Sequence, residues 1–117
     1  MNIVNKDEGV ASTMNDFELC PRFEKAIGIV SQRWTALILY QLMSGPQRFC
    51  TMTDKLGVSG KTLSERLKDL EQQDFVIRNV YPETPVRIEY SLTEKGMSLT
   101  PIMKEIENWS KTWIEKE

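Results

Sequence analysis

The chain has 117 residues, of which 40% are hydrophobic and 27% charged, and its formal net charge is −2. This length suits one domain rather than two, and no apolar run is long enough to cross a bilayer. Histidine is absent and there are two cysteines, so the commonest general base is missing and a structural zinc site lacks ligands. We expect a cytoplasmic protein that is not an enzyme, needs no cofactor or metal, and does not bind membranes.

The N-terminal part of the chain divides into a polar tail and a first helix. Residues 1–16 are small and polar and show no hydrophobic period, so we expect a flexible tail before a domain that spans residues 17–117. From Pro21 onward the pattern becomes helical, and the proline suits a first helical position, which places Cys20 at or beside the N-cap. The apolar residues that repeat at i, i+3, i+4 and i+7 are Phe23, Ala26, Ile27 and Val30.

Two further helices are predicted before the middle of the chain. The first ends at Ser44-Gly45-Pro46, where a residue suited to the left-handed conformation precedes a helix breaker. Its predicted apolar face consists of Trp34, Leu37, Ile38 and Leu42. The second is short, runs from Phe49 to Leu56 and ends at Gly57.

Residues 54–75 carry the clearest functional pattern. Gly57 permits a tight turn, and Ser59 is a good N-cap for the helix that follows. That helix places leucines at i, i+4 and i+7 toward the core and polar residues on its other sides. The leucines are Leu63, Leu67 and Leu70. A short helix, a glycine turn and a second helix with a polar face are typical of a helix-turn-helix.

A two-stranded hairpin is predicted directly after this second helix. The stretch from Phe75 to Tyr81 is rich in β-forming residues, and the two prolines of the segment from Pro82 to Pro85 make it a loop. In the following strand four apolar residues alternate with polar ones, which predicts a half-buried strand. They are Val86, Ile88, Tyr90 and Leu92. A hairpin in this place is the wing of a winged helix, so the predicted fold is α+β, mainly helical.

The last helical region carries large apolar residues in one stripe. Thr93 or Thr100 caps this region, and Pro101 either opens the final helix or kinks it. The stripe comprises Leu99, Ile102, Met103, Ile106, Trp109 and Trp113. It could cover the core of its own subunit, but so small a fold leaves little core for two tryptophans. We therefore expect a dimerisation helix, with an interface formed by Phe23, Ile102, Ile106, Trp109 and Trp113.

The polar face of the second helix of the helix-turn-helix is the candidate DNA-binding surface. Such a face could simply be solvated, and the acidic average charge counts against DNA binding. A DNA-binding protein needs a basic face rather than a basic average, however. The candidate residues are Ser59, Lys61, Thr62, Ser64, Glu65, Arg66 and Lys68. Among them, Lys61, Thr62 and Glu65 are candidates for contact with base edges, and Lys68 for contact with phosphate.

The wing offers further candidate contacts. Thr84 lies near its tip, and Arg78 and Arg87 lie on its two strands. We expect a wing contact with the minor groove or with phosphates, through Thr84 and Arg87 in particular. The alternative is cross-strand pairing of the arginines with Glu83 or Glu89.

Several short motifs follow one another in a specific order between residues 20 and 113. They are Cys20-Pro21, Arg33-Trp34-Thr35, Gly45 to Phe49, Leu63 to Leu67, Pro82 to Pro85, Tyr90 to Thr93, Gly96 and Trp109. Their order and spacing resemble the HxlR-type branch of bacterial winged-helix regulators, which are relatives of the MarR group. The chain departs from that pattern at Gln32-Arg33-Trp34, where Gly-Lys-Trp is usual, in a shorter turn from Leu56 to Ser59, and at Cys50, where a polar or charged residue is usual.

The resemblance implies a homodimer that docks two recognition helices in successive major grooves, and several such proteins respond to oxidation or alkylation of the cysteine in the Cys-Pro pair. A free cysteine is most often a small buried hydrophobe, but a helix N-terminus and the neighbouring Arg22 both favour a thiolate at Cys20. We expect Cys20 to react with an oxidant or electrophile. Cys50 is either its disulfide partner or a packing residue.

In regulators of this type the first helix packs in the dimer interface. We therefore favour a bond from Cys20 of one subunit to Cys50 of the other, which requires Cα atoms within about 7 Å or a movement that brings them there. The expected function is that of a transcriptional regulator, bound as a homodimer to a pseudo-palindromic operator and switched at Cys20. Control by a small-molecule ligand, or a winged helix that serves only protein–protein assembly, are the alternatives.

Overall fold

The computed structural model describes residues 19–116, and the chain divides into two units between Ser31 and Gln32. In the first unit the helix α2 (Pro21–Val30) begins as predicted, with its proline in the first turn and Cys20 at the N-cap. The flexible tail predicted for residues 1–16 lies outside the described residues.

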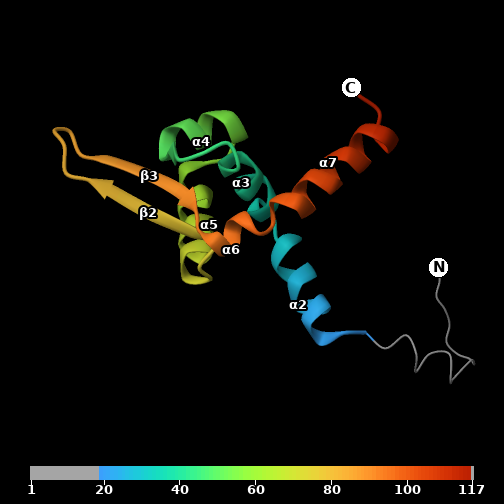
Figure 1. The fold of residues 1–117 in the computed structure, drawn as a ribbon. Helices are drawn as coiled ribbons and strands as arrows, with labels where there is room; N and C mark the ends of the chain where they lie inside the picture. Colours follow the sequence, from blue (N-terminus) through green and yellow to red (C-terminus); the bar gives the residue numbers. More distant parts are fainter. Residues whose placement is uncertain (1–18, 117) are drawn as a thin grey trace, which may run out of the picture. The chain divides into compact units, whose positions relative to one another are not determined.

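The second unit contains the helix-turn-helix, the wing and the C-terminal helix (Figure 1). Its elements are α3 (Thr35–Leu42), β1 (Gln47–Arg48), α4 (Phe49–Leu56), α5 (Gly60–Gln72), β2 (Val76–Tyr81), β3 (Arg87–Leu92), α6 (Glu94–Met97) and α7 (Thr100–Trp113). The architecture is mainly helical with a small antiparallel sheet, and it confirms the predicted winged helix-turn-helix.

The core of this unit lies among α3, α4, α5 and the base of the wing. The leucines of α5 enter it as their spacing predicts, and each is at most 1% exposed. The buried apolar residues are Ile38, Leu39, Leu42, Met52, Val58, Leu63, Leu67, Leu70, Phe75, Val76 and Met103. This core fixes the direction in which the polar side of α5 faces.

The predicted face of α3 is partly wrong. Leu37 is 53% exposed, whereas Leu39 and Thr35 are buried. The buried residues are Thr35, Ile38, Leu39 and Leu42, which is again the i, i+3, i+4, i+7 pattern, but it begins at a threonine. Trp34 is the N-cap in the left-handed conformation, with φ 75°, and therefore does not belong to the helical face.

The sheet has the strand order β1-β3-β2, and both pairings are antiparallel. Gln47 lies opposite Tyr90, and Val76 lies opposite Leu92. β1 was not predicted, because two residues are too few to show an alternating pattern. The expected burial alternation of the second strand is wrong: every residue of β3 is half-buried and Val86 is 55% exposed. The hairpin reaches away from the helices, so neither face of it is fully covered (Figure 1).

The return of the wing to the helices is a close backbone contact. The Thr93 N–H donates to the Phe75 carbonyl oxygen at 3.0 Å, and the Thr93 side chain caps α6 by accepting from the Gly96 N–H. A Cβ on Gly96 would collide with that same Phe75 oxygen. Of the two predicted caps, Thr93 is therefore the one used, and Pro101 lies in the first turn of α7 and opens it.

Candidate nucleic-acid interface and thiol positions

The turn between α4 and α5 has the predicted chemistry. Gly57 ends α4 in the left-handed conformation, with φ 67°, and its N–H donates to the Thr53 carbonyl oxygen at 2.9 Å. Val58 is buried and anchors the turn to the core. The Ser59 hydroxyl oxygen then caps α5 by accepting from the Thr62 N–H at 3.1 Å. The buried Val58 and the Ser59 cap thus fix the position of the first turn of α5.

The candidate DNA-contact residues of α5 lie away from its buried leucines. Among the candidates, the exposed residues are Ser59, Lys61, Glu65 and Lys68, and the half-buried residues are Thr62, Ser64 and Arg66. Arg66 is held by Asp69, with 2.7 Å between Nη2 and Oδ2. Within the described part of the chain, Lys61 and Lys68 form no ion pair. These two lysines are therefore the cations on α5 that are most accessible to a phosphate or base.

Arg87 is engaged within the wing itself. Its guanidinium group lies 2.9 Å from Glu83 and 2.6 Å from Glu89, and 4.0 Å from the centre of the Tyr81 ring. Hydrogen bonds from Arg87 lower the pKa of Glu83, and those to Glu83 and Glu89 raise the pKa of Arg87. In the isolated chain Arg87 therefore pairs with both carboxylates that the alternative interpretation named, although Glu83 lies in the loop and Glu89 on the same strand, so neither pair crosses the hairpin. Thr84 is exposed in the loop between β2 and β3.

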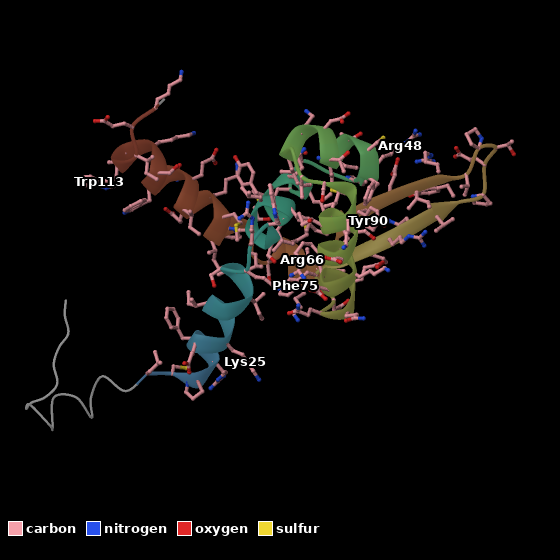
Figure 2. The ribbon with its side chains drawn as sticks, turned by 180° about the vertical axis from the view of Figure 1, so that it is seen from behind. Lys25, Arg48, Arg66, Phe75, Tyr90 and Trp113 are labelled. Carbon is pink, nitrogen blue, oxygen red and sulfur yellow. The ribbon has the colours of Figure 1, made fainter. Side chains whose placement is uncertain are left out.

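Arg78, which was not among the favoured contact residues, lines the same hollow as Lys68 of α5. A hollow of about 380 Å³ separates α5 from the wing. It is lined by Ser64, Leu67, Lys68, Glu71, Arg78 and Tyr90, and Figure 2 shows Tyr90 where the wing meets α5. The structure therefore brings Lys68 and Arg78 to one hollow, which the sequence alone did not indicate because the two residues belong to different elements.

The apolar stripe of α7 is largely uncovered. Met103 is buried in the core, but the rest of the predicted interface on this helix is exposed: Ile102, Ile106, Trp109 and Trp113. Trp109 is 60% and Trp113 70% exposed, and Figure 2 shows Trp113 at the end of α7 that is remote from the helix-turn-helix. In the first unit, Phe23 of α2 is exposed as well.

The two cysteines are free and exposed. Cys20 is the N-cap of α2, where its carbonyl oxygen accepts from the Glu24 N–H at 3.0 Å and its side chain makes no cap hydrogen bond. Cys50 is the second residue of α4, and its carbonyl oxygen accepts from the Thr53 hydroxyl at 2.9 Å. Each thiol is thus exposed to solvent at the N-terminal end of a helix. Cys20 belongs to the first unit and Cys50 to the second.

The comparison with known families identifies the class of protein. Residues 29–117 match the family described as HxlR-like helix-turn-helix. The chain belongs to this family. It is a helix-turn-helix transcriptional regulator, its class acts by binding DNA, and it is not an enzyme. Among the described residues, no helix is long and apolar enough to span a membrane.

The similar proteins and solved structures are those of transcriptional and redox regulators. YvaP of Bacillus subtilis, an uncharacterized HTH-type transcriptional regulator, is 57% identical over 103 residues, which cover 87% of this chain and 95% of YvaP. The reduced form of YodB from B. subtilis has a TM-score of 0.74 and 43% identity, covering 84% of this chain and 97% of YodB. The oxidized form of the redox regulator HypR has a TM-score of 0.75 and 28% identity, covering 83% of this chain and 100% of HypR.

Proposed function

We propose that this HxlR-family regulator binds a pseudo-palindromic operator as a homodimer, and that oxidation or alkylation of Cys20 changes its affinity for that operator. The observation that carries the proposal is that both free thiols are exposed at the N-terminal ends of helices. Free cysteines are usually buried, so two exposed thiols are open to reaction with oxidants and electrophiles. YodB has been described in reduced, diamide-treated and quinone-bound forms, and HypR as a redox regulator, which supports a thiol response here.

The DNA-binding face that we propose is the exposed side of α5 together with the wing. In this proposal, Lys61 and Glu65 contact base edges, and Lys68 contacts a phosphate. Arg87 would have to leave two carboxylates to reach DNA, whereas Arg78 shares a hollow with Lys68. We therefore propose Arg78 as the main cation of the wing.

The homodimer is proposed from the uncovered stripe of α7. Large apolar side chains that stay exposed on one helix favour association, because covering them removes apolar area from water. Phe23 of α2 offers a second apolar patch. Two recognition helices in such a dimer would reach successive major grooves about 34 Å apart, so a change at the interface would alter their spacing.

Two reactions at Cys20 would change the dimer interface and, with it, the spacing of the two recognition helices. In the oxidative reaction, the Cys20 thiol of one subunit and the Cys50 thiol of the other each give up one proton and one electron to a two-electron oxidant, and an S–S bond forms. In the alkylation, the Cys20 thiolate adds to an electron-poor carbon of a quinone-type electrophile, and the reduced ring takes up a proton. Either product alters α2, which the proposal places in the dimer interface.

The test is a non-reducing gel combined with mass spectrometry and a DNA mobility-shift assay, before and after treatment with diamide or benzoquinone. Diamide should convert the wild-type protein into a covalent dimer with a Cys20–Cys50 peptide. The Cys20→Ser and Cys50→Ser variants should each remain non-covalent. Benzoquinone should modify Cys20 in the wild type and in Cys50→Ser, and DNA affinity should change with each reaction.

The outcomes separate the parts of the proposal. A covalent dimer that persists in Cys50→Ser would contradict the Cys20–Cys50 bond but retain Cys20 as the reactive thiol. If Cys20→Ser protein loses or gains DNA affinity in the same way as the wild type, the switch at Cys20 is wrong, and the response comes from Cys50 or from control by a ligand.

A further inference from the structure

A second hollow lies beside the N-terminal end of α5, where three of the candidate DNA-contact residues meet the segment before α3. It has a volume of about 460 Å³. Its walls come from the segment before α3 and from the turn and first two turns of α5. The lining residues are Gln32, Arg33, Trp34, Gly57, Val58, Ser59, Thr62 and Arg66.

The lining combines two cations with hydroxyl groups. Arg33 is exposed, and its guanidinium carbon lies 5.4 Å from the centre of the Trp34 ring. Arg66 contributes the second guanidinium group, although Asp69 pairs with it. No carboxylate is among the described residues that line the hollow. The hollow therefore favours an anion with several oxygen acceptors, because each guanidinium group presents parallel N–H donors.

We propose that this hollow receives a phosphodiester group of the DNA backbone and that Arg33 is the side chain that contacts it. The proposal rests on the placement of α5 in the major groove. A recognition helix that enters a major groove by its N-terminal end has the DNA backbone on either side of that end, and the first helix of the helix-turn-helix lies across the backbone. Ser59 and Thr62 line the hollow from the start of α5, and Arg33 lines it from the segment that leads into α3.

The geometry assigns to Arg33 a contact that positions the protein without reading sequence. Phosphate contacts fix the register of a protein on the duplex but carry no base information. Lys68 and Arg78 lie in the separate hollow between α5 and the wing. One phosphate site at the start of α5 and another between α5 and the wing would hold the recognition helix at two points.

The experiment measures binding of the full-length reduced protein to two labelled duplexes of unrelated sequence over a range of salt concentrations. Arg33→Gln should weaken binding to both duplexes by about tenfold at low salt. It should also flatten the slope of log affinity against log salt by about one per subunit. Arg33→Lys should keep the slope but recover affinity only in part, because an ammonium group binds as a point charge. The control is Lys116→Gln, which removes one exposed charge beyond the end of α7.

Lys68→Gln distinguishes failure of this inference from failure of the proposed function. If Lys68→Gln flattens the salt slope and Arg33→Gln binds like Lys116→Gln, the phosphate site at Arg33 is wrong while the α5 face stands. If neither Lys68→Gln nor Arg33→Gln differs from the control, the orientation of α5 on DNA is wrong as well. Loss of binding to only one duplex by Arg33→Gln would also overturn the proposal, since it would mean base recognition. Thermal melting of each variant verifies that the fold is retained.

Discussion

The helices α5 and α7 have similar sequence patterns, but the apolar side of α5 is buried whereas that of α7 is largely exposed. Each carries large apolar residues on one side and charged residues on the other, yet the leucines of α5 are at most 1% exposed while Trp109 of α7 is 60% exposed. The difference teaches that an amphipathic pattern predicts that a face will be covered, but not by which surface. The subunit's own core covers α5. α7 is attached to its own unit by Met103 and by one side-chain hydrogen bond from α3, and most of its stripe is left for another surface.

The largest expected effect is on the stability of the subunit, through the buried apolar side of α5. Leu67→Ala should lower the free energy of unfolding by about 2–5 kcal/mol, because it removes a fully buried side chain and leaves a cavity. Urea unfolding at a fixed protein concentration measures it. The matched control is Leu37→Ala on α3, since Leu37 is 53% exposed and its truncation should change stability by about 0.5 kcal/mol or less. Equal losses for the two variants would contradict the assigned core.

An intermediate effect is expected on α7, and it should appear in assembly rather than in the fold of the subunit. Trp109→Ala should weaken the proposed dimer by about 2–4 kcal/mol, because truncation of an aromatic anchor is among the costliest changes in an interface. Sedimentation velocity over a dilution series measures the dimer dissociation. Ile77→Ala on the wing, which removes another exposed apolar side chain, should leave the dimer unchanged. A wild-type protein that stays monomeric at the highest concentration would show that the stripe is not a dimer surface.

The smallest expected effect concerns the bond that attaches α7 to α3. The Tyr40 hydroxyl donates to Glu107 Oε2 at 2.6 Å, and this hydrogen bond, with help from Lys111 and Lys104, lowers the pKa of Glu107. A lowered pKa in the folded state stabilises the protein above the usual glutamate pKa, and this stability is lost as the pH falls through the lowered value. Tyr40→Phe should therefore be slightly less stable than the wild type at neutral pH and equal to it in acid. Urea unfolding at several pH values tests this, and a difference that grows in acid would contradict it.

Much of the fold follows from local patterns. The leucine spacing of α5, the turn at Gly57 and the cap at Ser59 depend on residues within a few positions of one another, and each is found where the sequence predicts it. The two-residue strand β1 was missed because it exists only through pairing with β3, far along the chain. The exposure of Leu37 was missed because the covered stripe of α3 starts at a threonine.

In the candidate site, too, local patterns predict some features and not others. The exposed lysines of α5 could be predicted, because the polar face of a helix faces solvent when the leucines on its opposite face are buried in the core. The pairing of Arg87 with Glu83 and Glu89, which lie within four residues of it, was one of the two interpretations that the sequence allowed, and the structure decides between them. The meeting of Lys68 with Arg78 could not be predicted, because it depends on where the hairpin returns to the helices. Arg33 stood in a recognisable motif, but only the fold brings it beside the start of α5.

The sequence by itself determined the elements, the turn chemistry and the family of this regulator, because helix periodicity, glycine conformation and capping act over short distances along the chain. Only the tertiary structure decided which apolar stripe is left uncovered, that Lys68 and Arg78 line one hollow, and that both thiols are exposed. Those properties depend on contacts between residues that are distant in sequence. Burial is set by the neighbours that folding brings together, and no local pattern records it.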